Sequence, residues 1–253
     1  ITCNIIGLDA DGATMEIGGA GGDGIIATGN SHLVIGGSTA SDRNIISGTG
    51  DDGIIISGSS TANIQGNFIG TDKTGLLDKG NDDVGITITS SGQGTIIGGN
   101  TSLNPGVECA GSCNLISGNG PGIYIARDSL DPYLDSNLSI LGNFIGTDKT
   151  GSATIGNVSG ISITYADGIT IGGANTNERN IISGNTQNGI YLYSAHTNRV
   201  QDLIIQNNYI GTNNAGTSAL GNTLNGVLAF NHMPDLTITA VSYTHLTLPT
   251  KRI

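Results

Sequence analysis

The sequence is poor in residues that favour helices, and it contains no long apolar run. Trp is absent, and Phe occurs only three times in 253 residues. Basic residues are scarce: nine Lys and Arg face 20 Asp and Glu, for a net charge of −11. This balance argues against nucleic acid as a partner and, more weakly, against tight binding of acidic polysaccharides. No run approaches the ~18 apolar residues of a membrane helix, so we expect no membrane-spanning segment.

Glycine, by contrast, is abundant, and it punctuates a set of repeated words. There are 42 glycines. The word N-[IL]-I-S-G occurs three times, and I-x-G-N-F-I-G-T-D-K-T-G occurs at 64–75 and 140–151, with a weaker copy at 205–216. A Gly followed by alternating apolar residues recurs at spacings of 29 to 38 residues, at Gly24, Gly53, Gly85, Gly122, Gly160, Gly189 and Gly226.

Each apolar run between these glycines is too short for a helix. β-Branched residues bounded by Gly and Asn clusters are typical of short strands separated by turns. A repeat of this size built from strands predicts a solenoid of about seven coils. The equivalent residues Ile46, Ile116 and Ile182 should then stack inward. Asn residues at equivalent positions should stack their amides between coils, namely Asn4, Asn67, Asn143 and Asn208.

The order of the words, N-x-I-x-G-N-x-I-G-T-D-x-x-G, then G-I-x-I, I-G-G and N-I-I-S-G-N, resembles the right-handed parallel β-helix repeat proteins of pectin-lyase-like architecture. The closest likeness is to bacterial exported and surface proteins. The resemblance covers residues 1 to about 239. It implies an all-β, right-handed parallel β-helix that is secreted or placed at the cell surface. Lyases, hydrolases, epimerases, adhesins and structural segments share this architecture, so the fold does not select a function.

We divide the chain into a β-helix fragment, residues 1–240, and a tail, residues 241–253. The chain begins inside a repeat word, which favours an internal fragment of a longer protein with further domains. The tail reads VSYTHLTLPTKRI and contains no Gly, no Asn and no repeat word. It resembles translated read-through of a sequencing adapter, and we expect it to be non-native or disordered, with no place in the stacked core. The alternative is a genuine cap on the last coil.

Two of the three cysteines lie in an inserted segment, residues 100–113. A disulfide between Cys109 and Cys113 is plausible in an exported protein. Two free thiols are the alternative, and a zinc site is disfavoured because structural zinc takes four ligands and no His lies nearby. Cys3 occupies a repeat position that other copies fill with residues suited to turns, Gly66, Gly142 and Asn207.

The carboxylates offer two candidate chemistries. G-D-D at residues 50–52 resembles one motif of the polygalacturonase-type hydrolases, in which paired carboxylates act as acid and base. The N-T-D, G-H-G and R-I-K motifs do not accompany it, and Asp is a turn former, so we interpret Asp51 and Asp52 as a turn. G-G-A-G-G-D-G-I-I at 18–26 fits a calcium nonapeptide only once. Loop residues Asp9, Asp72 and Asp148 could bind calcium or form Asx turns, and we favour turns.

We therefore expect no catalytic, cofactor or metal residues, and a non-catalytic structural or adhesive segment of a large exported bacterial protein. Candidate partners are polysaccharides or cell-surface glycans, for which Tyr124, Tyr165, Tyr191 and Tyr193 could form an aromatic platform. Ordinary β surface is the alternative for these tyrosines. The rival function is a carbohydrate-active enzyme, a lyase or hydrolase, whose active site has diverged or is missing. An enzyme should gather charged residues from adjacent coils on one face, whereas a rod should spread them.

Overall fold

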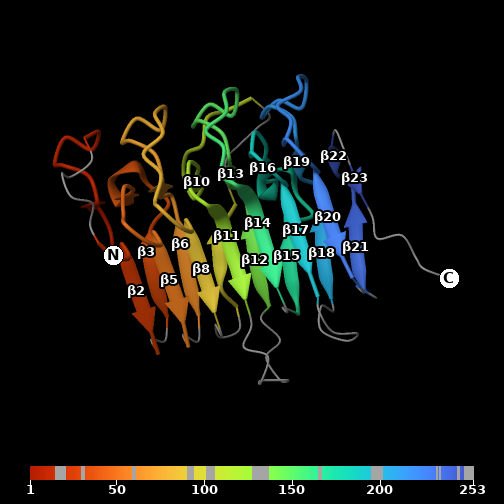
Figure 1. Ribbon diagram of the computed structural model, residues 1–253, viewed down its shortest axis with the longest axis horizontal. Helices are drawn as coiled ribbons and strands as arrows, with labels where there is room; N and C mark the ends of the chain where they lie inside the picture. Colours follow the sequence, from red (N-terminus) through yellow and green to blue (C-terminus); the bar gives the residue numbers. More distant parts are fainter. Residues whose placement is uncertain are drawn as a thin grey trace.

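The chain folds into a parallel β-solenoid, as seen in a computed structural model (Figure 1). This confirms the predicted all-β class and coil architecture. The structure describes residues 1–14, 21–29, 32–58, 61–89, 94–100, 106–126, 137–164, 167–194, 202–231, 233, 235–243 and 246–247. Within these residues the only helices are two 3₁₀ turns, η1 (Ala40–Asp42) and η2 (Thr176–Glu178).

Three parallel sheets of eight, eight and seven strands run the length of the solenoid. These strand numbers are to be compared with the seven or so coils that the sequence predicts. Strands adjacent in a sheet come from successive coils, so segments between 19 and 47 residues apart lie side by side (Figure 1). At ~4.8 Å per strand, an eight-stranded sheet spans roughly 34 Å from first strand to last. We call the sheets 1, 2 and 3.

Sheet 1 is built from two-residue strands. They are, in spatial order, β1 (Ile5–Ile6), β4 (Ile45–Ile46), β7 (Phe68–Ile69), β10 (Leu115–Ile116), β13 (Phe144–Ile145), β16 (Ile181–Ile182), β19 (Tyr209–Ile210) and β22 (Ser242–Tyr243).

Sheets 2 and 3 have longer strands. Sheet 2 holds β2 (Ile25–Thr28), β5 (Ile54–Ser57), β8 (Ile86–Thr89), β11 (Pro121–Ala126), β14 (Ser159–Thr164), β17 (Ile190–Tyr193), β20 (Val227–Phe230) and β23 (Leu246–Thr247). Sheet 3 holds β3 (Leu33–Gly36), β6 (Ala62–Gln65), β9 (Ile96–Gly98), β12 (Leu138–Leu141), β15 (Ile169–Ile171), β18 (Leu203–Gln206) and β21 (Leu236–Thr239).

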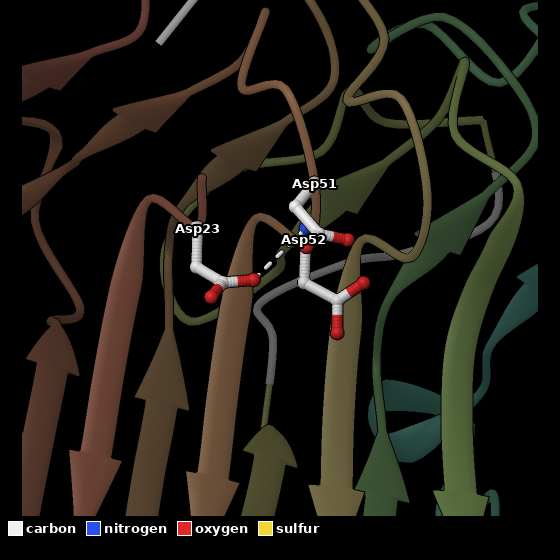
Figure 2. A group of neighbouring side chains, drawn as sticks. All are labelled: Asp23, Asp51 and Asp52. Atoms are coloured by element: carbon white, nitrogen blue, oxygen red, sulfur yellow. Dashed lines mark hydrogen bonds between the residues drawn. The ribbon is translucent and has the colours of Figure 1, made fainter. Parts of the chain in front are cut away.

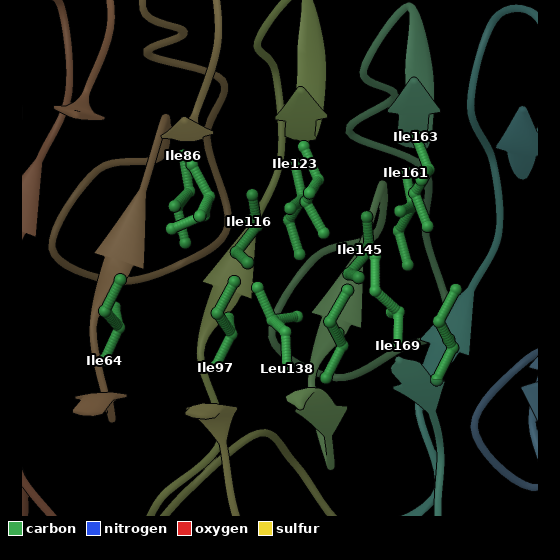
Figure 3. Close-up of a cluster of buried hydrophobic side chains, with 14 of the residues drawn as sticks. Ile64, Ile86, Ile97, Ile116, Ile123, Leu138, Ile145, Ile161, Ile163 and Ile169 are labelled. Carbon is green, nitrogen blue, oxygen red and sulfur yellow. The ribbon is translucent and has the colours of Figure 1, made fainter. Parts of the chain in front are cut away.

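The core is a narrow stack of aliphatic side chains between the three sheets. Alternate residues of each strand point inward, because side chains of a strand alternate between its two faces. Ile46, Ile116 and Ile182 are fully buried and belong to one continuous ladder in sheet 1, which confirms the predicted register. Figure 3 shows Ile116 and Ile145 projecting towards residues of the other two sheets, such as Ile123 and Ile97.

The outer side of sheet 1 is covered by the I-G-T-D-K-T-G loops. Gly75 has a φ of +69°, and a Cβ there would lie 2.9 Å from the Phe68 ring, so a larger residue would not fit. Arginines close the same surface: the guanidinium of Arg43 lies 3.9 Å from the centroid of Phe68. Arg179 lies 4.0 Å from the centroid of Tyr209. Each arginine therefore covers the aromatic ring of the next coil by a cation–π contact.

One coil replaces the arginine by a disulfide. Cys113 stands immediately before Asn114, where Arg43 and Arg179 stand before their own asparagines. It forms a disulfide with Cys109, with 5.4 Å between the Cα atoms. Both sulfur residues are buried in one cluster with Phe144. The disulfide thus packs with the aromatic ring of the next coil, as Arg43 and Arg179 do two coils away on either side.

Two ladders of asparagine side chains run along the solenoid. The four asparagines predicted to stack do so, but each alternates with the asparagine of an N-I-I-S-G word. The first ladder is Asn4, Asn44, Asn67, Asn114, Asn143, Asn180 and Asn208. A second ladder, which the sequence did not predict, joins Asn81, Asn119, Asn157, Asn185 and Asn222.

The turn predicted at Cys3 is confirmed. Its φ is +61°, close to the values of Gly66, Gly142 and Asn207 at the equivalent corners. Glycine reaches this region without a steric cost and Asn reaches it at a small one.

The start of the tail differs from expectation. Ser242 pairs with Tyr209, and Leu246 pairs with Val227, so parts of residues 241–253 extend sheets 1 and 2. Val241 also packs against the core. The physical reason is that the last coil presents free backbone groups, which any extended segment can pair with: the N–H of Ser242 donates to the carbonyl of Asn208 at 3.1 Å. That the tail is non-native stays a prediction.

Candidate functional sites

Carboxylates from two adjacent coils meet at one edge of sheet 2. Asp23 precedes β2, and Asp51 and Asp52 precede β5 (Figure 2). Ligand oxygens of all three lie within 4.8 Å of one another. We call this group the acidic cluster. It includes the two aspartates of the G-D-D motif and adds Asp23, the aspartate of the nonapeptide match.

The sequence itself contains a signal that Asp23 and Asp52 lie close together. Asp23 and Asp52 each stand directly before a Gly-Ile pair that opens a strand, and they are one coil apart. Residues at the same place in successive coils must lie side by side in a solenoid. Residues 18–20 of the nonapeptide match lie outside the described residues.

The cluster is held by backbone hydrogen bonds that run from coil to coil. The N–H of Asp52 donates to Oδ1 of Asp23 at 3.1 Å. In the same way, the N–H of Val84 donates to Oδ1 of Asp52 at 3.0 Å. Each carboxylate therefore accepts the N–H of its counterpart in the next coil. Asp52 is buried, whereas Asp51 is exposed.

The acidic cluster also affects the pKa of a fourth carboxylate, that of Asp83. Partial burial raises the pKa of Asp83 above its ordinary value, and the negative charges of Asp52 and Asp51 raise it further. Desolvation and like charge both disfavour the ionised form. The edge is therefore a site of concentrated negative potential at neutral pH.

The chemistry available to the cluster is limited by its surroundings. A pair of carboxylates can divide the roles of acid and base when their pKa values are driven apart. Among the described residues, no Lys, Arg or His forms an ion pair with the cluster. Three carboxylates could contribute oxygen ligands to a hard cation, which takes six to eight in the case of calcium. Two of them already accept backbone hydrogen bonds, so the present arrangement is explained by coil stacking alone.

The loop carboxylates form turns. Oδ1 of Asp72 accepts the N–H groups of Leu76 and Leu77, and Asp148 makes the same bonds in its own loop. Burial raises the pKa of Asp72, but hydrogen bonds from Thr74, Leu77 and Leu76 outweigh it and leave the pKa below its ordinary value. Asp72 and Asp148 therefore hold their own loops closed, through N–H groups four and five residues on rather than the second residue that an Asx turn bonds.

The second candidate site is an aromatic platform on the outer face of sheet 2. The rings of Tyr191 and Tyr193 are 6.5 Å apart and within 18° of parallel. Phe230, on the next strand, lies 6.0 Å from Tyr193 and within 15° of parallel. Phe230 is 52% exposed. Tyr124 shares the row of Tyr191, separated from it by Ser162. We call Tyr191, Tyr193 and Phe230 together the aromatic platform.

Tyr191 and Tyr193 are among the tyrosines predicted from the sequence. Phe230 is not, although the alternation of Val227 to Phe230 places its ring outward on β20, the strand next to β17 in sheet 2. Tyr165, the fourth predicted tyrosine, lies outside the described residues.

No protein-family model, curated protein or solved structure matches the chain. Among the described residues, no helix is long and apolar enough to cross a membrane.

Proposed function

We propose that this chain is a non-catalytic, structural and adhesive segment of a large exported bacterial protein, and that it contacts polysaccharides or cell-surface glycans. The observation that carries the proposal is the aromatic platform, because aromatic rings on a regular sheet present broad apolar faces next to hydroxyl groups. The repeated words and the three parallel sheets support a place among the right-handed β-helix proteins of pectin-lyase-like architecture.

Stiffness follows from the ladders. Successive coils are joined by parallel strands in three sheets and, along most of the solenoid, by buried asparagine amides, whose loss would leave polar groups without partners. Such a repeat body keeps its outer faces in a fixed register. A rigid face suits adhesion, because the protein itself loses little conformational entropy when a polymer binds to it.

One observation favours the rival function, an enzyme that acts on carbohydrates. The acidic cluster gathers Asp23, Asp51 and Asp52 from adjacent coils, as expected for an active site. The cluster lacks ion-paired basic partners among the described residues, and coil stacking accounts for its geometry. We therefore keep catalysis as the second candidate.

A single experiment separates the two. Purified protein is applied to immobilised plant, algal and bacterial polysaccharides, and the same polymers are assayed in solution for new reducing ends and unsaturated products. The proposal requires retention without product formation, and weaker retention of Tyr193→Ala. Product formation that disappears in Asp51→Asn/Asp52→Asn would establish the enzyme instead.

A further inference from the structure

We infer that the glycan is an uncharged polysaccharide laid against the outer face of sheet 2, an inference that rests on the proposed function. The outer face consists of two rows of side chains that continue from strand to strand. From β2 to β20 the rows are Ile26, Ile55, Thr87, Tyr124, Ser162, Tyr191 and Leu228, and Thr28, Ser57, Thr89, Ala126, Thr164, Tyr193 and Phe230.

None of these fourteen positions carries a charge, although 11% of the chain is charged. Six are Ser or Thr, of which all but the buried Thr87 and Ser162 are open to a ligand, and four are Tyr or Phe. A sugar ring has hydroxyl groups at its edge and C–H groups on its faces, so hydroxyls and aromatic rings complement it without requiring any charge. An ionic polymer would find no counter-charge on this face.

The edge of the same sheet disfavours polyuronates. The acidic cluster and Asp83 lie where β2, β5 and β8 begin. β8 and β17 are three strands apart, so this edge lies on the order of 15 Å from the aromatic platform along the stack. Repulsion reaches that far at 0.01 M salt, where the Debye length is ~30 Å, and is screened at 0.15 M, where it is ~8 Å. The chain's net charge of −11 acts in the same direction.

The row geometry fits a polymer rather than a single sugar. The platform offers rings both along one strand, Tyr191 and Tyr193, and across to the next, Phe230. Tyr124 stands two strands from Tyr191 with Ser162 between them, and Ser162 is 8% exposed. Successive units of a polymer could therefore contact several rings, and each contact would add to the affinity.

Affinity electrophoresis with polymer cast into a native gel tests this inference. The probes are hydroxyethyl cellulose and galactomannan as uncharged polymers, polygalacturonate and alginate as polyuronates, and chitosan as a cationic polymer. We expect retardation by at least one uncharged polymer, with the same strength at 10 mM and 500 mM NaCl. Tyr191→Ala/Tyr193→Ala should weaken it about tenfold. Tyr191→Phe/Tyr193→Phe should retain most of it, and Ile204→Ala, on the outer face of sheet 3, should be unchanged.

Melting temperatures of all variants establish that each is folded. Stronger retardation by a polyuronate or by chitosan, with loss of binding at high salt, would overturn the inference and leave glycan adhesion standing. Retardation by uncharged polymer that survives the double Ala substitution would also overturn it, because the face would not be the site. Failure of the folded parent to bind any of the five probes would overturn both this inference and the proposed function.

Discussion

The side-chain amide of Asn114 donates to Oδ1 of Asn143 at 2.9 Å, although 29 residues separate the two in the chain. The ladder continues at Asn143, whose Nδ2 donates to Oδ1 of Asn180 and to the carbonyls of Ile97 and Leu141. Both partners are fully buried. One side chain thus satisfies polar groups of several coils.

Asn143→Ala should therefore destabilise the protein by about 2–3 kcal/mol, because it removes the acceptor of the buried N–H and side-chain amide of Asn114 and interrupts the ladder to Asn180. Urea unfolding followed by circular dichroism measures the loss. Asn100→Ala is the matched control, because Asn100 is exposed. Equal midpoints for the two variants would show that the ladder contributes nothing to stability.

Ile182→Asp should cost several kcal/mol, since it places a charge in a core position with no exposed surface. The same substitution at Ile204, which points outward and is 36% exposed, should cost much less. The comparison is made by thermal melting at pH 7. A parent-like melt for Ile182→Asp would contradict the inward register of sheet 1.

Arg179→Ala should lower stability by about 0.5–2 kcal/mol through loss of the cation–π contact with Tyr209. It also removes the hydrogen bond from Nε to the carbonyl of Asn207, which measures 2.9 Å. Arg179→Lys keeps the charge but not the planar group, so it should recover only part of the loss. Full recovery by Lys in a melting experiment would mean that charge alone matters at this position.

Asp72→Asn tests the pH dependence of the loops. The pKa of Asp72 is lowered in the folded state, so its carboxylate stabilises the fold above the unfolded value of 3.8, and this stability is lost as pH falls through the folded pKa. The stability difference between parent and variant should shrink from pH 7 to below pH 3. Asn213 occupies the equivalent position and accepts the N–H of Thr217, so Asn213→Asp is the reciprocal control. A difference that is constant with pH would contradict the assignment.

Asp51→Asn/Asp52→Asn should leave glycan retention unchanged, because the platform lies elsewhere on the sheet. Asn at position 52 can still accept the N–H of Val84, so we expect no loss of stability. With both charges removed, the pKa of Asp83 should fall towards its ordinary value, which NMR titration of its carboxyl carbon measures. An unchanged Asp83 pKa would show that the charges do not couple.

Much of the fold could be predicted from repeated words. Ile46, Ile116 and Ile182 recur in the same word, and identical words must occupy identical places in stacked coils. The cover over sheet 1 could not be predicted in this way. Arg43 and Cys113 occupy the same repeat position but differ in chemistry. Only the structure shows that both pack against an aromatic ring of the next coil, Phe68 and Phe144 respectively.

The candidate sites, too, could be predicted only in part. The Asp51-Asp52 pair and the tyrosines were visible as residue types, but their neighbours were not. Asp23 reaches the pair, and Phe230 reaches Tyr193, only because particular coils are adjacent and in register. A difference of one residue in coil length would have turned Phe230 to the other face of its strand and moved Asp23 out of register with Asp52.

By itself, the sequence determined that this protein is a parallel solenoid of short strands with aliphatic residues inside and Gly or Asn at its corners. Those features are local and periodic, so each repeat specifies them independently. The tertiary structure decided which side chains from different coils meet: the acidic cluster, the aromatic platform, the second asparagine ladder and the pairing of Ser242 with the last coil. These depend on the register between coils, which is set by loop lengths and by hydrogen bonds between residues some thirty positions apart.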